Sequence, residues 1–464
     1  QWELKNYFNQ LYTKEKYTWG IRLYIRYTHC PASLTVAHRN LPILFADNML
    51  IANCIYHRNE LSSPDNISEN TYRTVIGQTH ESILAEYEEM NTGNAYTDNV
   101  LYGMRKINGV NYQLTGGFCG ELSSVKQENA YSAHSYSFYT VPRIEWERND
   151  FLFTAATTVR WSHLPKQSYS RFCVSPFFCF RYKFTPRWKM SLLGSLDESE
   201  GGLKDIYPFR YREDYRTVVK HTGKVPVTVR QLYTCYLEYK NTIKEFFWTL
   251  SASYSHNRYN LITERNYKDG NFYLSSVERN HSSHSYTLNT IGSKGIYDWN
   301  LKTSLELTLA RNEGKQLNEG IVQDYRYDYL CIEPKIVWAP SVFFEAEYKA
   351  TVSCVGGGIG EDTSLDPLWE VAQRLTLSLE FHDTEFRLSG EHFYNDLSKN
   401  QHLNIWLADV SLIHKVGKWR FAASAINLFN KEQYRYTLYS AVQSYTSWIK
   451  LRPREFMVSV QYQW

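Results

Sequence analysis

The amino-acid sequence predicts an all-β protein, a large antiparallel transmembrane β-barrel of about 20–22 strands with no plug domain evident in the chain. Three observations lead to this prediction: a period-two alternation of apolar and polar residues, an alternation of short and long connections, and tryptophans at one end of the strands. The composition agrees, because aromatic residues make up 16 % of the chain while the mean hydropathy is only −0.49. A barrel wall needs apolar side chains at alternate positions only.

Residues 299–309 show the alternation clearly. The odd positions are Trp299, Leu301, Thr303, Leu305, Leu307 and Leu309, and the even ones are Asn300, Lys302, Ser304, Glu306 and Thr308. Segments 342–353 and 374–382 divide in the same way. Such strands run about 10–13 residues, near the length that crosses a bilayer at a tilt, whereas globular strands average about 5–6. The polar face carries charges of both signs, so we expect it to line an aqueous lumen.

The connections alternate in length along the chain. Tight turns are predicted at 106–109, 147–150, 185–187, 240–242, 382–384 and 414–417, where Asn, Asp, Gly and Pro supply the geometry. Longer loops are predicted at roughly 196–229, 255–283, 311–325, 354–370 and 427–446. Short periplasmic turns and long extracellular loops would produce this order. The pattern is clear over 108–464 and weaker over 1–107, and we predict one outer-membrane barrel over 1–464.

Six tryptophans test the orientation. Strands counted back from the C-terminus place the following near one set of strand ends: Trp146, Trp188, Trp299, Trp338, Trp419 and Trp464. Amphipathic rings favour the membrane–water interface. We therefore expect a periplasmic aromatic belt.

Charge and cysteine usage exclude other classes. The net charge is +3 and basic residues are spread along the chain, which argues against nucleic acid as a partner. The eight cysteines form no Cys-x-x-Cys pair, which favours isolated thiols over a disulfide framework. No signal peptide is visible at Gln1, so we expect that an export signal has been removed or that a longer polypeptide precedes this chain.

The last ten residues alternate strictly and end on an aromatic side chain. One face carries Phe456, Val458, Val460, Tyr462 and Trp464. This ending resembles the strand that the barrel assembly machinery reads in outer-membrane proteins. The machinery is therefore an expected partner, through the strand ending at Trp464, and outer-membrane lipid is another.

A narrower resemblance follows from two elements near the C-terminus. Asn427-Leu-Phe-Asn430 and, after a loop, Pro453-Arg-Glu-Phe456 resemble the end of TonB-dependent receptors over residues 415–464. The resemblance implies a barrel of about 22 strands that binds a scarce or bulky nutrient at its outer loops. It also implies a plug on which inner-membrane TonB pulls. Since no plug or TonB box is found, we expect the barrel portion of a longer transporter.

One segment predicted as an outer loop combines aromatic and basic residues. It contains Tyr207, Phe209, Arg210, Tyr211, Arg212, Tyr215 and Arg216. Aromatic faces stack on sugars or rings, and guanidinium groups hold carboxylates or phosphates. The segment is the candidate substrate-binding site, although a self-packed loop would have the same composition.

Other candidates for chemistry are weaker. His281 and His284 form a close pair without further metal ligands beside them, and 356–366 lacks the spacing of a calcium loop. No Gly-x-Ser-x-Gly elbow is present. We expect no metal, no cofactor and no enzymatic activity. The following lumenal charges are expected to pair across neighbouring strands: Glu306, Glu345, Glu347, Lys349, Arg374, Glu380, Arg387 and Glu391.

The leading functional prediction is nutrient import through the outer membrane of a Gram-negative cell by the barrel of a TonB-dependent receptor. The substrate is left open, and TonB would act through a plug that this chain lacks. A passive porin-like pore is the first alternative. The second is a structural barrel that anchors surface lipoproteins, with such a lipoprotein as its partner.

Overall fold

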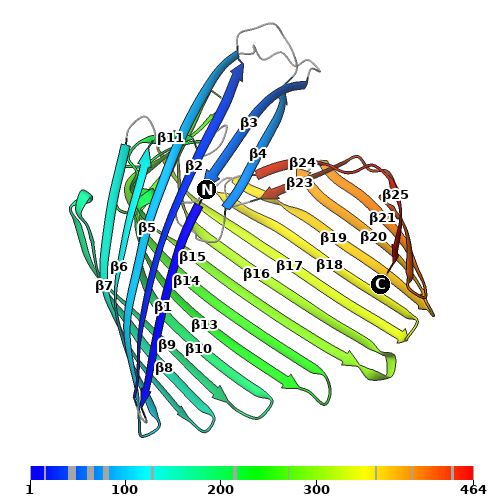
Figure 1. The fold of residues 1–464 in the computed structure, drawn as a ribbon, viewed down its shortest axis with the longest axis horizontal. Coiled ribbons are helices and arrows are strands. Elements are labelled where there is room, and N and C mark those ends of the chain that lie inside the picture. Colours follow the sequence, from blue (N-terminus) through cyan, green and yellow to red (C-terminus); the bar gives the residue numbers. More distant parts are fainter. Residues whose placement is uncertain are drawn as a thin grey trace.

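One curved antiparallel sheet holds almost every strand in the computed structural model of the protein (Figure 1). The structure describes residues 2–14, 17–39, 49–59, 67–76, 83–126, 130–212, 217–269, 271–360, 363–398, 401–439 and 444–462. No helix in these ranges is both long and apolar enough to cross a membrane.

The wall of the sheet is formed by strands that each pair with the next wall strand along the chain. Its first part comprises β1 (Trp2–Lys14), β2 (Tyr17–Arg39), β5 (Ile83–Ile107), β6 (Val110–Lys126), β7 (Ala130–Arg148), β8 (Phe151–Leu164), β9 (Tyr169–Lys183), β10 (Trp188–Glu200) and β13 (Val227–Asn241). Its second part comprises β14 (Phe246–Lys268), β15 (Asn271–Ile296), β16 (Leu301–Asn318), β17 (Ile321–Ser341), β18 (Phe344–Ile359), β19 (Thr363–Phe381), β20 (Thr384–Ser398), β21 (Gln401–Val416), β22 (Trp419–Ile426) and β25 (Glu455–Tyr462).

The wall confirms the all-β antiparallel prediction, with 19 strands in the described ranges against the 20–22 expected. The difference lies in the first hundred residues. There β2 pairs directly with β5, and β3 (Met49–Asn59) and β4 (Ile67–Ile76) form a hairpin beside β2 instead of two further crossings. Within the described ranges no ladder joins β1 to β25, so the sheet is open along these two strands.

One end of the sheet, which we call the turn end, carries the tight turns. The connections there are 108–109, 149–150, 184–187, 242–245, 297–300, 342–343, 382–383 and 417–418, and they confirm all six predicted turns. Asn108 and Gly109 have φ of 48° and 81°, and Gly417 has 56°. Asparagine and glycine tolerate this left-handed region, which two-residue turns require.

At the opposite end, the loop end, three of the predicted long loops are strands. Segments 255–283, 311–325 and 354–370 are tall hairpins, since β14 continues to Lys268 and β15 begins at Asn271, for example. Register continues without interruption between β16 and β17 up to Asn318 opposite Ile321. The prediction of loops was wrong because polar residues occupy most positions on both faces of these extensions, with apolar ones such as Ile262 and Leu317 only scattered among them. The period-two signal of a strand is therefore absent from the sequence.

Among the residues that the structure describes, two of the predicted long loops remain loops at the loop end. The first, 201–226, holds η2 (Leu203–Ile206), β11 (Arg210–Arg212) and β12 (Thr217–Lys220), and β12 lies parallel to β15 at 272–275. The second, 427–454, contains the separate hairpin β23 (Gln433–Tyr439) and β24 (Ser444–Lys450). Single-turn helices η1 (Pro165–Gln167) and η3 (Tyr297–Trp299) occupy two other connections.

Candidate functional site: the two faces of the sheet and its mouth

The outward face of the wall is apolar although nothing in the structure covers it. Leu305 and Leu309 are 50 % and 40 % exposed, and the ladder places them beside Pro334 and Leu330 of the next strand. The same face on β19 carries Leu375, Leu377, Leu379 and Phe381. Soluble proteins rarely expose a continuous apolar surface of this extent. This face therefore requires an apolar environment.

Aromatic side chains lie at both borders of the apolar face. At the turn end Trp146, Trp188, Trp299, Trp338 and Trp419 lie at or beside strand ends, which confirms their predicted placement at one set of strand ends, while Trp464 lies outside the described residues. Toward the loop end Tyr233, Tyr254 and Tyr286 are consecutive cross-strand partners, and Trp369 and Trp406 are exposed. On β14 six positions separate Trp248 from Tyr254, and on β19 twelve separate Trp369 from Phe381, so the height of the apolar stretch differs along the wall.

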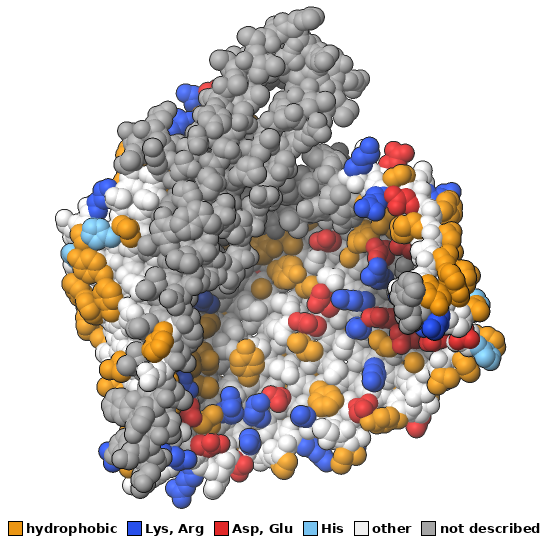
Figure 2. Space-filling view, in the orientation of Figure 1, with side chains coloured by type: hydrophobic (Ala, Val, Ile, Leu, Met, Phe, Trp, Pro, Cys, Tyr) orange, Lys and Arg blue, Asp and Glu red, His pale blue; other side chains and the backbone are white. Residues whose placement is uncertain are grey.

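The inward face is polar, and charges of both signs are interspersed over it (Figure 2). Lys335 of β17 pairs with Glu347 of β18 at 2.9 Å, and Arg374 of β19 pairs with Glu391 of β20 at 2.7 Å. These contacts confirm the predicted cross-strand pairing for Glu347, Arg374 and Glu391.

The remaining predicted charges behave differently. Arg387 pairs at 2.8 Å with Glu385, two positions away on its own strand, so its predicted cross-strand pairing was wrong. Glu306 accepts a hydrogen bond from the Asn289 amide at 2.8 Å. In the part of the chain that the structure describes, Glu345, Lys349 and Glu380 form no ion pair. Lumenal carboxylates and an ammonium thus remain open to solvent and solutes.

Loop 201–226 packs on the inward face at the loop end. Ile206 is fully buried and forms a core with Ala133 of β7, Leu164 of β8 and Val225. Pro226 accepts a hydrogen bond from the Gly201 backbone N–H at 2.7 Å, which closes the base of the loop. This folded loop, 201–226, therefore forms a layer over the inward face at the loop end of the sheet, and we call it the shelf.

The aromatic residues of the predicted binding segment hold this shelf together. Tyr207 is 3 % exposed and lies edge-on to Tyr131 of β7, with ring centroids 5.6 Å apart. Phe209 and Tyr211 pack against Tyr207 at 5.4 and 6.1 Å. Burial raises the pKa of the Tyr131 phenol. Tyr207 is thus a packing residue in this structure.

The other members of the predicted segment are more accessible or lie elsewhere. Arg210 is exposed and its guanidinium lies over the Tyr273 ring, 5.1 Å from the centroid. Arg212 is described by its backbone in β11, and Tyr215 and Arg216 lie outside the described residues. Phe209, Arg210 and Tyr211 are therefore the predicted residues that the structure places together and leaves at least partly exposed.

A charged cluster beside the shelf was not predicted from the sequence. Arg171 of β9 pairs with Glu198 of β10 at 3.0 Å, and Arg160 of β8 lies 3.8 Å from Glu200. The buried Nε atoms of both arginines have no hydrogen-bond partner among the described residues. Three strands contribute the cluster, and no sequence motif links positions so far apart.

The histidines do not gather into a metal site. His284 lies on the outward face, where its Nδ1 is 3.3 Å from Nδ1 of His256, whereas His281 stacks on Tyr259. An odd separation of three positions places His281 and His284 on opposite faces of the strand. Burial is the main cause that lowers the pKa of His256, and the nearby His284 and Arg258 lower this pKa further. His256 lies on the loop-end side of Tyr254. Over the described ranges no three His, Cys, Asp or Glu side chains could hold one ion.

Comparison with known proteins finds similarity among solved structures. No family model matches the sequence, and no curated protein matches it. Among solved structures, the chain is similar to the crystal structure of the ferric yersiniabactin uptake receptor FyuA from Yersinia pestis, with 10 % identity and a TM-score of 0.42. The match covers 96 % of this chain and 68 % of that one.

Proposed function

We propose that the chain is an outer-membrane barrel protein that transports solutes. The apolar outward face contacts lipid and the charged inward face borders an aqueous path. The observation that carries this proposal is the contrast in polarity between neighbouring residues of one strand. Leu305 is exposed on the outward face, whereas Glu306 lies on the inward face and accepts a hydrogen bond from Asn289. A strand with this contrast over about ten residues suits a bilayer on one side and water on the other.

The orientation follows from the two ends. Short turns belong on the periplasmic side and long connections outside the cell. In this orientation loop 201–226 forms a shelf at the external mouth, where Phe209, Arg210 and Tyr211 meet incoming solute. An aromatic ring beside a guanidinium suits a ligand with a ring and an acidic group. We assign binding and passage to these residues, without chemical conversion.

The finer proposal is the barrel of a TonB-dependent receptor that imports a nutrient. Its support is the C-terminal resemblance over 415–464, together with the folded loop at the mouth. Cross-linking in native membranes tests it: the gene product as expressed in its host should cross-link to TonB. A passive pore or a lipoprotein anchor would show no such product.

Conductance through a planar bilayer tests the coarser proposal of a wet lumen. The purified full chain should insert and conduct ions. Glu347→Gln removes a lumenal carboxylate and should shift the reversal potential in a salt gradient toward anion selectivity. Lys335→Gln removes its partner and should shift selectivity toward cations, because both side chains are more than one third exposed. The two variants are matched controls for each other, since both break the same ion pair.

The outcomes separate the alternatives. Shifts of opposite sign support an aqueous path along the inward face. Insertion without current would favour the structural anchor, whose lumen is blocked. Conduction with identical selectivity in both variants would place the ion path away from this face and overturn the proposal.

A further inference from the structure

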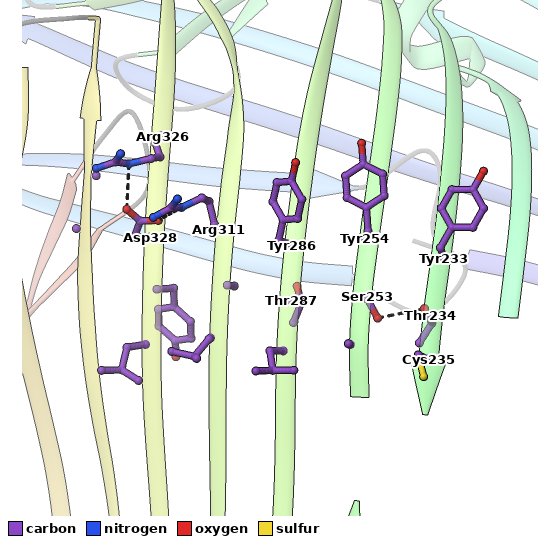
Figure 3. Close-up of a pocket in the computed structure, with 18 of the residues that line it drawn as sticks. Tyr233, Thr234, Cys235, Ser253, Tyr254, Tyr286, Thr287, Arg311, Arg326 and Asp328 are labelled. Carbon is purple, nitrogen blue, oxygen red and sulfur yellow. Dashed lines mark hydrogen bonds and ion pairs between the residues drawn. The ribbon is translucent and has the colours of Figure 1, made fainter. Parts of the chain in front are cut away.

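A polar row crosses the outward face near the loop end. Tyr233, Tyr254, Tyr286, Arg311 and Asp328 are successive register partners on five neighbouring strands, β13 to β17. Figure 3 shows the row, with the tyrosine hydroxyls directed away from Cys235 and Ser253. These charged residues are therefore on the apolar face of the sheet and not in the lumen.

An apolar groove of about 1110 Å³ lies on the turn-end side of this row. The lining follows one cross-strand row on the outward face, in which Leu192, Cys235 and Ala252 are followed by Leu288, Leu309, Leu330 and Cys354. Phe178 also lines the groove. Cys235 and Ala252 are smaller than the leucines on either side of them, which leaves a hollow along the surface where a flexible hydrocarbon chain fits.

Two arginines share one carboxylate at the rim of the groove. Arg311 donates from Nε to Asp328 Oδ1 at 2.6 Å, and Arg326 forms an ion pair with Asp328, with its Nε 3.0 Å from Oδ2. Their side chains are 49 % and 54 % exposed. In the described structure their terminal nitrogens have no hydrogen-bond partner. Asp328 contacts both guanidinium groups, while Glu313, the cross-strand partner of Arg326, lies on the same face and forms no ion pair with either arginine among the described residues.

A second, polar pocket of about 480 Å³ adjoins the groove, and the two share Arg326 and Gly357. His284, Lys315 and Ser282 add hydrogen-bond donors, while Glu313 and Asp324 also line it. Gly357 has φ of 151°, and a Cβ there would lie 2.0 Å from the Arg326 carbonyl oxygen. Glycine is therefore required at this position, and no side chain projects into the pocket from it.

We propose that the outward face binds a membrane lipid with a phosphorylated headgroup, an inference that rests on the proposed membrane location. The phosphate lies at Arg311 and Arg326, the rest of the headgroup occupies the polar pocket, and an acyl chain follows the groove. Paired guanidinium groups match phosphate oxygens in charge and geometry. A free phosphate ion would leave the groove empty, whereas a lipid satisfies the groove and the arginines together.

Lipid retention by the purified full chain tests this assignment. The chain in detergent is incubated with phosphatidic acid or with diacylglycerol of the same acyl chains, passed through a gel-filtration column, and analysed for bound lipid by native mass spectrometry. We expect at least about tenfold more phosphatidic acid than diacylglycerol on the wild-type chain. Arg311→Gln with Arg326→Gln should abolish the preference. The matched control, Arg374→Gln with Arg387→Gln, removes two inward arginines and should keep it.

Two further measurements keep the test decisive. Ala252→Trp fills the groove but leaves both arginines, so it should lower retention of phosphatidic acid severalfold even if the double arginine variant fails to fold. Inorganic phosphate at millimolar concentration should not displace the lipid. Equal retention of both lipids by the wild-type chain, displacement by phosphate alone, or full retention by Ala252→Trp would each overturn the proposal.

The result is separable from the proposed function. A wild-type chain that inserts and conducts but shows no headgroup preference would refute the lipid site alone. A chain that stays in solution without detergent would refute the membrane location on which both rest.

Discussion

At the scale of single residues, Asn427 explains why an Asn-Leu-Phe-Asn element occurs at the end of β22. Its side-chain amide donates at 2.8 Å to the carbonyls of Lys431 and Arg452, and its Oδ1 accepts from the Lys431 N–H at 2.9 Å. Its backbone N–H donates to Asp409, and its φ is 53°. Asn430 accepts from the Arg454 N–H at 2.9 Å. The element joins both ends of loop 427–454 to the wall.

Asn427→Ala should therefore lower the free energy of unfolding by about 2–4 kcal/mol, because it removes three side-chain hydrogen bonds at a buried position and places a β-carbon residue at positive φ. Denaturant unfolding of the chain in lipid vesicles measures the change. Asn99→Ala is the control, since its amide makes one bond, to Thr97 at 3.2 Å, and about 1 kcal/mol or less is expected. Equal losses in the two variants would show that Asn427 does not fasten the loop.

At the scale of elements, the shelf 201–226 shows where a sequence pattern leaves two readings open. Interleaved Tyr and Arg residues predict a ligand site or a self-packed loop. The structure shows a self-packed loop at Tyr207 and Ile206, which are buried, whereas Arg210 is exposed and its role in a ligand site stays a prediction. Burial depends on Tyr131 and Leu164, which are far away in sequence, so no local pattern could distinguish the two kinds of residue.

Tyr207→Ala should open the shelf without unfolding the wall. Removing a buried aromatic side chain costs about 3–5 kcal/mol. Most of that loss falls on the loop, because the core packs on one face of β7 and β8 and the ladder hydrogen bonds of these strands do not depend on it. Trypsin cleavage within 201–226, followed by mass spectrometry, should accelerate more than about tenfold. The control is Tyr236→Ala, a tyrosine that is 44 % exposed in β13. Unchanged cleavage in the Tyr207 variant would contradict a shelf held by this ring.

The strands of the wall were the most predictable elements, and their polar extensions the least. Between the aromatic belts one side of each strand must be apolar, so a segment such as 299–309 shows its period in the sequence. Beyond the aromatic residues both sides of a strand contact water, and the pattern disappears although the ladder continues to Asn318 opposite Ile321. The charged cluster of Arg160 and Arg171 and the arginine pair on the outward face depend on cross-strand register, which a single sequence does not specify.

At the scale of the whole molecule, the sheet consists of two surfaces with opposite solvent requirements. The outward surface between the belts is apolar apart from the row of Arg311 and Asp328 near its border, and the inward surface is charged over its whole height. In water the outward surface would be a continuous aggregation site. A hydrocarbon environment on the outward side would remove this liability, as the proposed membrane location requires.

Adjacent residues at mid-height test this division directly. Leu305, midway between Trp299 and Arg311, faces outward, and Ser304 faces the lumen. Leu305→Arg should lower the free energy of unfolding in vesicles by about 2–4 kcal/mol, because it places a guanidinium in the hydrocarbon core. Ser304→Arg adds the same side chain one position away but in water, and a change within about 0.5 kcal/mol is expected. Vesicle binding should fall in the first variant and stay unchanged in the second. Equal effects, or a larger loss for Ser304→Arg, would mean that the apolar residues face something other than lipid.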